Sequence, residues 1–263
     1  MDVGPEQVGT REVDVMPISK SKGNMYPWIT GSWNPIKGGC SHRCKYCYMR
    51  LDPKPAIRAK YDGDSYLDLE DLSGTNMGVG QTLFIGSATD MFARDVCSTH
   101  IEMVLEKLLR SPGNTYVLQS KAPHNMWNYI EYFAQMNVLL GTTIETNRWA
   151  GEYKVSQAPH PVYRAMGLNG LLGFKKYVSI EPVMDFDMGE MLTFIKWIKP
   201  QFVSIGADSK RCKLPEPPKE KVIELVAELR KTTEVKLKPN LKRLIGKEGR
   251  AIPPPAKAGG LLA

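Results

Sequence analysis

Cysteine is scarce in this sequence, and no long hydrophobic run opens it. Five cysteines in 263 residues argue against a disulfide-stabilised scaffold, because proteins of that class are small and cysteine-rich. The first 25 residues carry both signs of charge and no apolar run, so they predict neither a secretory signal nor a membrane anchor. We therefore expect a cytoplasmic protein with no membrane partner.

An excess of negative charge is also missing, since the net charge is +7. From residue 208 onward, 14 Lys and Arg face 7 Asp and Glu, which leaves 21 of each in the first 207 residues. Clustered cations can neutralise phosphates, so the C-terminal region predicts contact with DNA or RNA. A solvated tail that only aids solubility is the alternative. The cations expected to form the phosphate-binding surface are Lys238, Lys242, Arg243, Lys247 and Arg250.

The composition is that of a globular protein with a sizeable core, with 42% hydrophobic and 24% charged residues. The length exceeds a typical domain of about 150 residues, but single α/β barrels commonly reach about 250. We expect a flexible leader over residues 1–25, one main domain over 26–245, and a disordered tail over 246–263 that is basic and rich in Pro and Gly.

Short apolar runs alternate with amphipathic helical patterns along the main domain. This alternation predicts βα units around a parallel sheet, either an open doubly wound sheet or a barrel. Polar clusters follow the predicted strands, and barrel sites collect at the carboxyl ends of strands. The pattern therefore favours a partial (β/α)6 TIM-like barrel. The predicted strands lie within residues 26–35, 82–86, 115–120, 138–144, 176–180 and 202–206, with a short seventh at 235–238, and the predicted helices at 99–109, from 123, near 160–168, from 187 and at 222–229.

Three of the five cysteines fall within eight residues, as Cys40, Cys44 and Cys47. Thiolates at this C-x3-C-x2-C spacing suit a soft metal centre, either an iron–sulfur cluster or zinc. Zinc would need a fourth ligand such as His42 or a distant cysteine, and structural zinc sites usually show two paired half-sites. Only one half-site is present here, so the spacing favours the cluster.

The triplet, with Tyr46 before its last cysteine, resembles the C-x3-C-x-aromatic-C motif of the radical SAM superfamily. The resemblance implies a 4Fe-4S cluster on the three cysteines, with S-adenosylmethionine on the open iron and an external electron donor. Further segments across roughly residues 28–245, including Trp33-Asn34-Pro35 and Ser179-Ile180-Glu181-Pro182, resemble a radical-SAM-like family of phage and prokaryotic genomes. That family has no defined function and is distantly similar to spore photoproduct lyase, a DNA-repair enzyme.

Polar residues at the strand ends are candidates for binding S-adenosylmethionine. Tyr46 could stack on the adenine, and Ser87 or Asp90 could accept from the amino group, although this segment departs from the Gly-Gly-Glu motif usual in the superfamily. A structural role, in a cap or a surface ion pair, is the alternative for each. The remaining candidates are Lys121 and Arg148 for the carboxylate, Thr143 and Glu145 for the ribose, and Glu181 at the end of a later strand.

The leading functional hypothesis is an enzyme that cleaves S-adenosylmethionine to a 5′-deoxyadenosyl radical, acting on an unknown substrate that could be nucleic acid. The alternative is a non-enzymatic zinc or iron–sulfur module that binds nucleic acid. Cys212, after the sixth strand, is a candidate hydrogen donor to a substrate radical. A surface cysteine without a role is the simpler interpretation of that residue.

Overall fold

The structure is a computed structural model that describes residues 16–20 and 25–246 of the chain. The expected tail beyond residue 246 and most of the expected leader lie outside these ranges.

The described part of the leader forms two short strands that take part in sheets. Strand β1 (Met16–Pro17) pairs in parallel with β6 (Thr75–Asn76). Strand β2 (Ser19–Lys20) pairs antiparallel with β3 (Gly31–Trp33). Residues 16–20 are thus paired strands and differ in this from the expected flexible leader.

The main sheet has eight strands, and all except the edge strand β2 run parallel to one another. Their order across the sheet, from β3 to β12, follows their order along the chain. The α/β class with a parallel central sheet is as predicted, and the strand positions agree with the apolar runs. The strands that follow β3 are β7 (Thr82–Ile85), β8 (Thr115–Gln119), β9 (Asn137–Thr143), β10 (Lys175–Ile180), β11 (Phe202–Ile205) and β12 (Glu234–Leu237).

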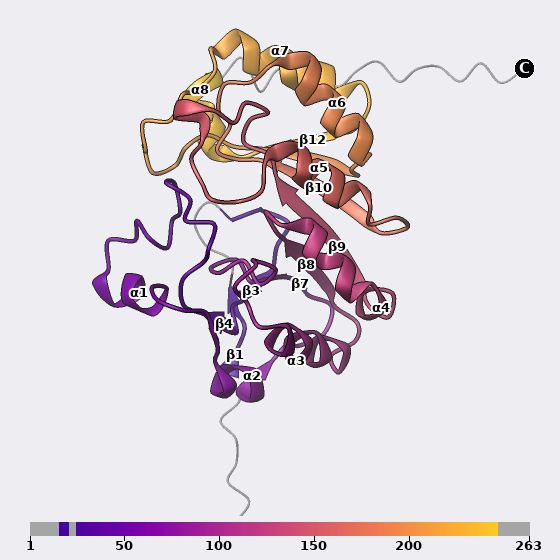
Figure 1. Cartoon of the computed structure of the whole chain (residues 1–263). Helices are drawn as coiled ribbons and strands as arrows, with labels where there is room; N and C mark the ends of the chain where they lie inside the picture. The colour runs from indigo at the N-terminus through magenta and orange to yellow at the C-terminus, as the bar shows by residue number, and fades with distance from the viewer. Residues whose placement is uncertain (1–15, 21–24, 247–263) are drawn as a thin grey trace, which may run out of the picture.

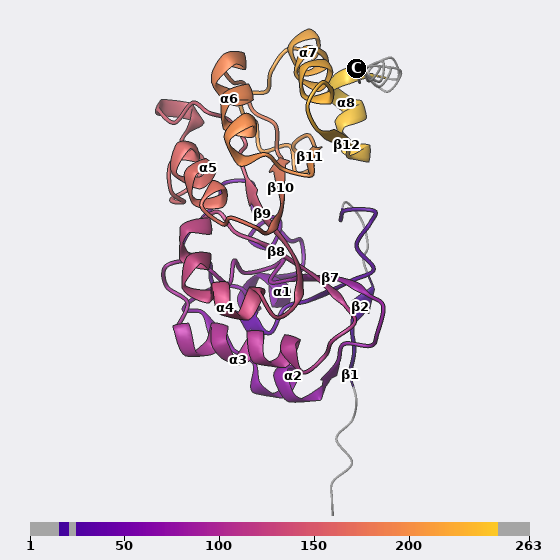
Figure 2. The ribbon, with the colours of Figure 1, turned by 90° about the vertical axis from the view of Figure 1, so that its right-hand side faces the viewer.

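The connecting helices follow one another along the same face of this sheet (Figures 1 and 2). This arrangement follows from the strand order, because right-handed crossovers that always advance in one direction place every helix on one side. The carboxyl ends of the parallel strands therefore meet at one edge. The helices are α3 (Ser98–Leu109), α4 (Ile130–Phe133), α5 (Pro161–Asn169), α6 (Met188–Ile198) and α7 (Lys219–Arg230).

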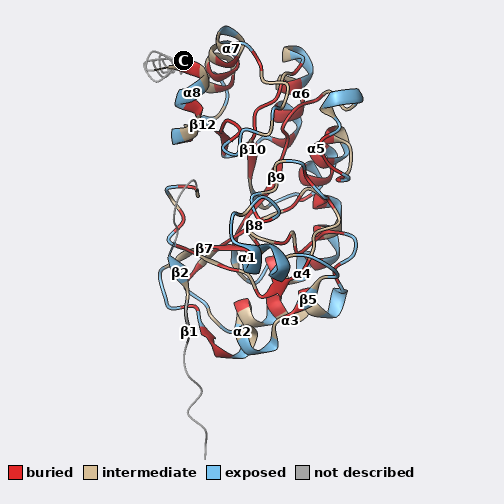
Figure 3. Ribbon diagram, turned by 90° about the vertical axis from the view of Figure 1, so that its left-hand side faces the viewer, coloured by how far each residue is buried: buried red, intermediate tan, exposed pale blue. Residues whose placement is uncertain are grey.

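Apolar side chains cover both faces of the sheet, which makes the strands the most buried part of the molecule (Figure 3). Leu118 of β8 belongs to the large core shared with the helices. Its neighbour Val117 points the other way, into a second cluster with Tyr26 and Tyr177. The first predicted strand is accordingly shorter than expected, because residues 26–29 pack on this second face.

Between β3 and β7 the chain forms short elements, among them two helices. Strand β4 (Ile36–Lys37) pairs antiparallel with β5 (Tyr66–Leu67). A short helix, α8 (Lys242–Ile245), is the last element of the described chain. No helix within the described residues has the length and apolar character needed to cross a lipid bilayer. The elements between β3 and β7 are β4 (Ile36–Lys37), α1 (Pro55–Lys60), β5 (Tyr66–Leu67) and α2 (Leu69–Gly74), and the last helix is α8 (Lys242–Ile245).

The helix predicted to begin at Pro123 is partly wrong. Residues Pro123–Tyr129 form a 3-10 helix before α4 begins. A 3-10 helix has three residues per turn. Residues spaced for the inward face of an α-helix therefore do not all face the sheet. Of the three apolar side chains that an α-helix from Pro123 would turn inward, Trp127 is 48% exposed and Ile130 is 40% exposed, whereas Phe133 is buried.

Candidate active site

The three clustered cysteines lie on the loop between β4 and α1, which we call the cysteine loop (residues 38–54). The loop begins with Gly38 at φ +83°, where a Cβ would stand 2.0 Å from the Asp64 carbonyl oxygen. Gly39 donates its backbone N–H to the Gly63 carbonyl over 3.0 Å. Glycine is therefore required here so that the start of the loop can pack against residues 63–65.

All three cysteines are free thiols that line one pocket of about 150 Å³. The pocket opens at the carboxyl edge of the sheet, between the cysteine loop and the ends of β7, β8 and β9. Eight of the twelve predicted site residues line it. They are Cys40, Cys44, Cys47, Tyr46, Ser87, Asp90, Lys121 and Thr143.

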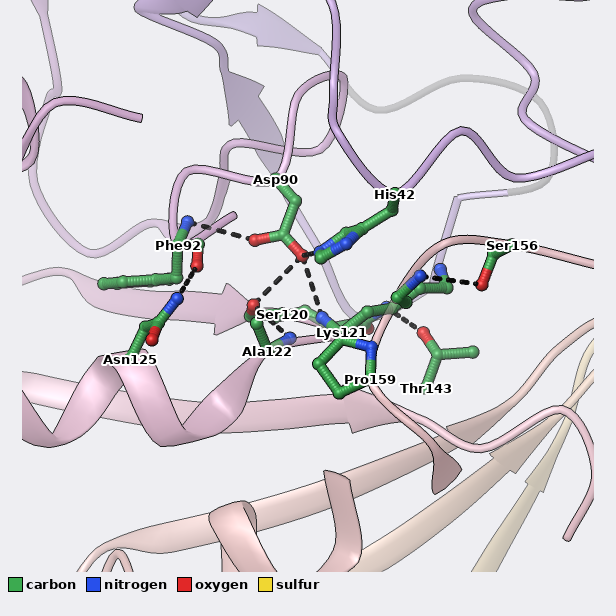
Figure 4. A network of polar contacts seen from close by, with 12 residues as sticks. His42, Asp90, Phe92, Ser120, Lys121, Ala122, Asn125, Thr143, Ser156 and Pro159 are labelled. Carbon is green, nitrogen blue, oxygen red and sulfur yellow. Dashed lines mark hydrogen bonds and ion pairs between the residues drawn. The ribbon is translucent and has the colours of Figure 1, made fainter. Parts of the chain in front are cut away.

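Asp90 joins the cysteine loop to the strand ends (Figure 4). One carboxylate oxygen lies 2.9 Å from His42 Nε2 and accepts from Ser120 Oγ over 3.0 Å and from the Lys121 N–H over 2.8 Å. Burial acts to raise the Asp90 pKa, but His42 and these hydrogen bonds outweigh it and hold the pKa below its usual value. This carboxylate has its partners within the protein, so a role as an anchor of the loop fits it better than the predicted contact with an amino group.

Two thiols of the triplet have raised pKa values. Burial raises the pKa of Cys40 to about 12, and the Asp90 charge adds to the effect. Burial also raises the pKa of Cys44, which Lys121 opposes. These thiols are thus protonated at neutral pH until a metal centre displaces their protons.

Lys121 lines the pocket beside Tyr46 and Glu145. Its Nζ lies 5.4 Å from the centre of the Tyr46 ring and 3.9 Å from Glu145 Oε1. Glu145 does not line the pocket. It is fully buried and pairs with Arg164, which the sequence analysis missed. The available signal was the place of Arg164 on the same helical face as the core residue Leu168.

Ser87 sits in the turn after β7 and is held from two sides. Its hydroxyl donates to Asn34 Oδ1 over 3.1 Å, and its carbonyl accepts from the Tyr48 hydroxyl over 2.8 Å. At the end of β8, Gln119 Nε2 donates to Thr143 Oγ1 over 2.9 Å. Asn34, Tyr48 and Gln119 thus shape the site, and none of them was predicted.

Two of the predicted residues have partners elsewhere. Arg148 is paired with Asp185 and Asp187 on a partly exposed surface, the latter over 2.7 Å. Glu181 pairs with Lys238 over 2.7 Å. Neither lines the pocket, so the structure gives both the structural role that the sequence analysis named as the alternative.

Cys212 follows β11 and is not among the residues that line the pocket. Its backbone N–H donates to the Asp208 carboxylate. Burial and the Asp208 charge raise the Cys212 pKa, and Lys210 only partly opposes them. The Asp208 carboxylate and burial thus favour the protonated thiol of Cys212 over the thiolate.

The expected C-terminal phosphate-binding surface loses two members. Lys238 is buried in its pair with Glu181, and Arg243 is paired with Glu216. Lys247 and Arg250 lie outside the described residues. Of the five cations, only Lys242 is described as exposed and is without an ion-pair partner among the described residues.

The donor set of the pocket fits an iron–sulfur cluster. Cysteine thiolates are the usual ligands of such clusters, and three free thiols that could supply them border one pocket. Within the described ranges, no three Cys, His, Asp or Glu side chains converge as ligands of one ion. A cubane cluster does not require that convergence, because each thiolate binds a different iron.

The chain matches one known protein family over most of its length. Residues 24–209 match the family described as "Protein of unknown function (DUF5131)". This chain belongs to that family. Curated proteins gave no match.

Solved structures similar to this member of the DUF5131 family are those of spore photoproduct lyase. A cysteine-to-alanine mutant of the lyase matches with a TM-score of 0.56 and 11% identity, covering 83% of this chain and 80% of the lyase. The lyase with bound AdoMet and dinucleoside spore photoproduct matches with a TM-score of 0.52 and 12% identity, covering 80% and 64%. The chain thus spans slightly less than two thirds of that lyase chain. At these identities the likeness concerns the fold alone, which is α/β with a mostly parallel central sheet, as predicted.

Proposed function

We propose that this protein is a radical SAM enzyme that holds a 4Fe-4S cluster on Cys40, Cys44 and Cys47. One observation carries the proposal. Three free thiols at C-x3-C-x2-C spacing border a single pocket at the carboxyl edge of a parallel sheet, in a fold similar to that of spore photoproduct lyase. When bound, such a cluster would supply the electron that cleaves S-adenosylmethionine to a 5′-deoxyadenosyl radical.

The pocket residues then have distinct tasks. Lys121 is the cation that would hold the carboxylate of S-adenosylmethionine, because it lines the pocket and is only 17% exposed. Tyr46 would stack on the adenine, and Thr143 would bond a ribose hydroxyl. The Ser87 carbonyl oxygen would accept a hydrogen bond from the amino group of S-adenosylmethionine. It has a second lone pair for this, besides the one that faces the Tyr48 hydroxyl.

We further propose lyase-like chemistry on nucleic acid as the reaction that follows, in view of the similarity of the fold to that of spore photoproduct lyase. The ligand-bound structure of spore photoproduct lyase contains AdoMet and dinucleoside spore photoproduct. An external electron donor would be needed in every version.

Anaerobic reconstitution with iron and sulfide tests the proposal. We expect about four irons per chain, and 5′-deoxyadenosine after addition of S-adenosylmethionine and dithionite. Replacing any one of Cys40, Cys44 and Cys47 by Ala should prevent stable iron incorporation. Cys97→Ala is the matched control, because Cys97 is exposed and lies outside the loop. One zinc per chain with no iron uptake would instead favour the non-enzymatic zinc module.

A further inference from the structure

The cysteine loop and α1 carry an uneven charge that the count over the whole chain conceals. Residues 40–60 contain six cations and a single acidic residue, Asp52. All six side chains belong to exposed residues. We call this set the loop cations, and they are Arg43, Lys45, Arg50, Lys54, Arg58 and Lys60.

The loop cations have no carboxylate partners among the described residues. Arg58 donates to the main-chain oxygen of Asp52, and none of the six forms an ion pair in that part of the chain. Lys37, Arg148 and Lys238, by contrast, are each paired with a carboxylate. Six like charges on neighbouring turns repel one another, and a bound polyanion would remove that repulsion.

An exposed aromatic ring stands among these charges at the mouth of the pocket. Tyr48 is 43% exposed and lines the pocket together with Arg43 and Arg50. Its hydroxyl is held by the Ser87 carbonyl, so the ring has a defined position. Leu51, also 43% exposed, follows on the same loop. Cations interleaved with an exposed aromatic ring are the features that bind single-stranded nucleic acid, through phosphates and stacked bases respectively.

We propose that the cysteine loop and α1 form a docking surface for single-stranded nucleic acid, which places one nucleotide at the pocket. The strand must be unpaired at this point, because bases within a duplex are stacked on each other and cannot stack on Tyr48. Binding of the strand requires only this surface and does not depend on the proposed function. The further statement that the nucleotide in the pocket is the substrate rests on the proposed function.

Fluorescence anisotropy of the reconstituted full chain with a labelled single-stranded oligonucleotide tests the docking surface. The variant is Arg50→Ala with Lys54→Ala, which removes two loop cations. We expect weaker binding and a log–log salt slope reduced by about 1.4, at about 0.7 per lost phosphate contact on single strands. The matched control is Lys175→Ala with Lys196→Ala, which lowers the net charge equally at two exposed sites on β10 and α6. Equal slopes for the two double variants would overturn the proposal.

Tyr48→Leu separates stacking from charge. Loss of one stacked base should weaken binding by about fivefold to a hundredfold, whereas Tyr48→Phe should retain most of the affinity. Polyglutamate, which carries charge but no bases, should compete poorly. If polyglutamate displaces the oligonucleotide and Tyr48→Leu binds as tightly as the wild type, the surface docks an acidic protein and the proposal is wrong.

The two proposals can fail separately. Formation of 5′-deoxyadenosine without oligonucleotide binding would overturn the docking surface and leave the enzyme proposal intact. Oligonucleotide binding that depends on Arg50, Lys54 and Tyr48 in a chain that incorporates no iron would support the docking surface and overturn the enzyme proposal.

Discussion

Arg164 Nη1 lies 2.5 Å from Glu145 Oε2, and both side chains are fully buried. The pair connects α5 with the residue that follows the end of β9, directly behind the pocket. Arg164 also donates from Nε to the Pro159 carbonyl over 2.7 Å. Glu145 Oε1 has no hydrogen-bond partner, and Lys121 Nζ is 3.9 Å away from it. The buried pair thus supports the lysine that we assign to S-adenosylmethionine.

Breaking this pair should destabilise the fold strongly. Arg164→Met leaves the Glu145 carboxylate buried without its cation, and we expect a loss of about 3–5 kcal/mol in the free energy of unfolding. Glu145→Leu combined with Arg164→Met should cost clearly less than the sum of the single changes, because neither the buried carboxylate nor the buried guanidinium is left without the other. Urea unfolding of the three variants completes the double-mutant cycle, and additive losses would show that the two residues are not coupled.

Lys121 and Arg148 were both candidates for the carboxylate of S-adenosylmethionine, and the structure separates them. Lys121→Met should raise the Kd for S-adenosylmethionine roughly tenfold or more, since a hydrogen bond to a charged group contributes about 1.5–3 kcal/mol. Arg148→Met should leave that Kd unchanged. Anaerobic calorimetry on protein with equal iron content measures both, and a larger effect at Arg148 would reverse the assignment.

Lys238 should matter for stability rather than for nucleic-acid binding. Lys238→Met leaves Glu181 with one fewer partner in a mostly buried position, and we expect a loss of about 1–3 kcal/mol. Lys242→Met, at an exposed residue of the same region, should change stability by less than about 0.5 kcal/mol. Chemical denaturation gives the comparison, and a reduced salt slope for oligonucleotide binding in Lys238→Met would return the lysine to the phosphate-binding surface.

Asp71 should make stability depend on acidic pH. It accepts from Lys37 Nζ over 2.6 Å, from Trp33 Nε1 over 2.8 Å and from Thr75 Oγ1 over 2.8 Å. Burial acts to raise its pKa, but Lys37 and the other donors outweigh it and lower the pKa below 3.8. A lowered pKa in the folded state means that this stabilisation is present above about pH 4. It should be lost as the pH falls through the folded-state pKa.

The measurement is the difference in unfolding free energy between the wild type and Asp71→Asn as a function of pH. We expect the wild type to be more stable at pH 7 and the difference to shrink below about pH 4. A difference that stays constant down to pH 3 would mean that the Asp71 carboxylate is not linked to folding.

Cys212 remains a predicted hydrogen donor that the geometry favours little. Its raised pKa keeps it a thiol, which the chemistry requires, but it does not line the pocket. If it donates, Cys212→Ala should form 5′-deoxyadenosine at the normal rate while the substrate radical goes to side products. Mass spectrometry of the products decides, and an unchanged product would leave Cys212 as a loop residue.

The sequence by itself determined the fold class and picked out the three cysteines that border one pocket. Apolar runs at regular intervals, as at residues 82–86 and 115–120, specify buried parallel strands, because such strands are covered on both faces. The spacing of Cys40, Cys44 and Cys47 keeps their thiols at one pocket, because residues so close in the chain must stay close in space.

Only the tertiary structure decided which charged side chains have an ion-pair partner. Lys238 and Arg148 looked available in the sequence, but each meets a carboxylate that is distant along the chain, Glu181 and Asp185 respectively. The partners of an ionised side chain depend on which loops the strand order brings to one edge. For the same reason Asp90 became an anchor for His42, whereas Arg50 and Lys54, which lie among other cations, kept their charges exposed to solvent.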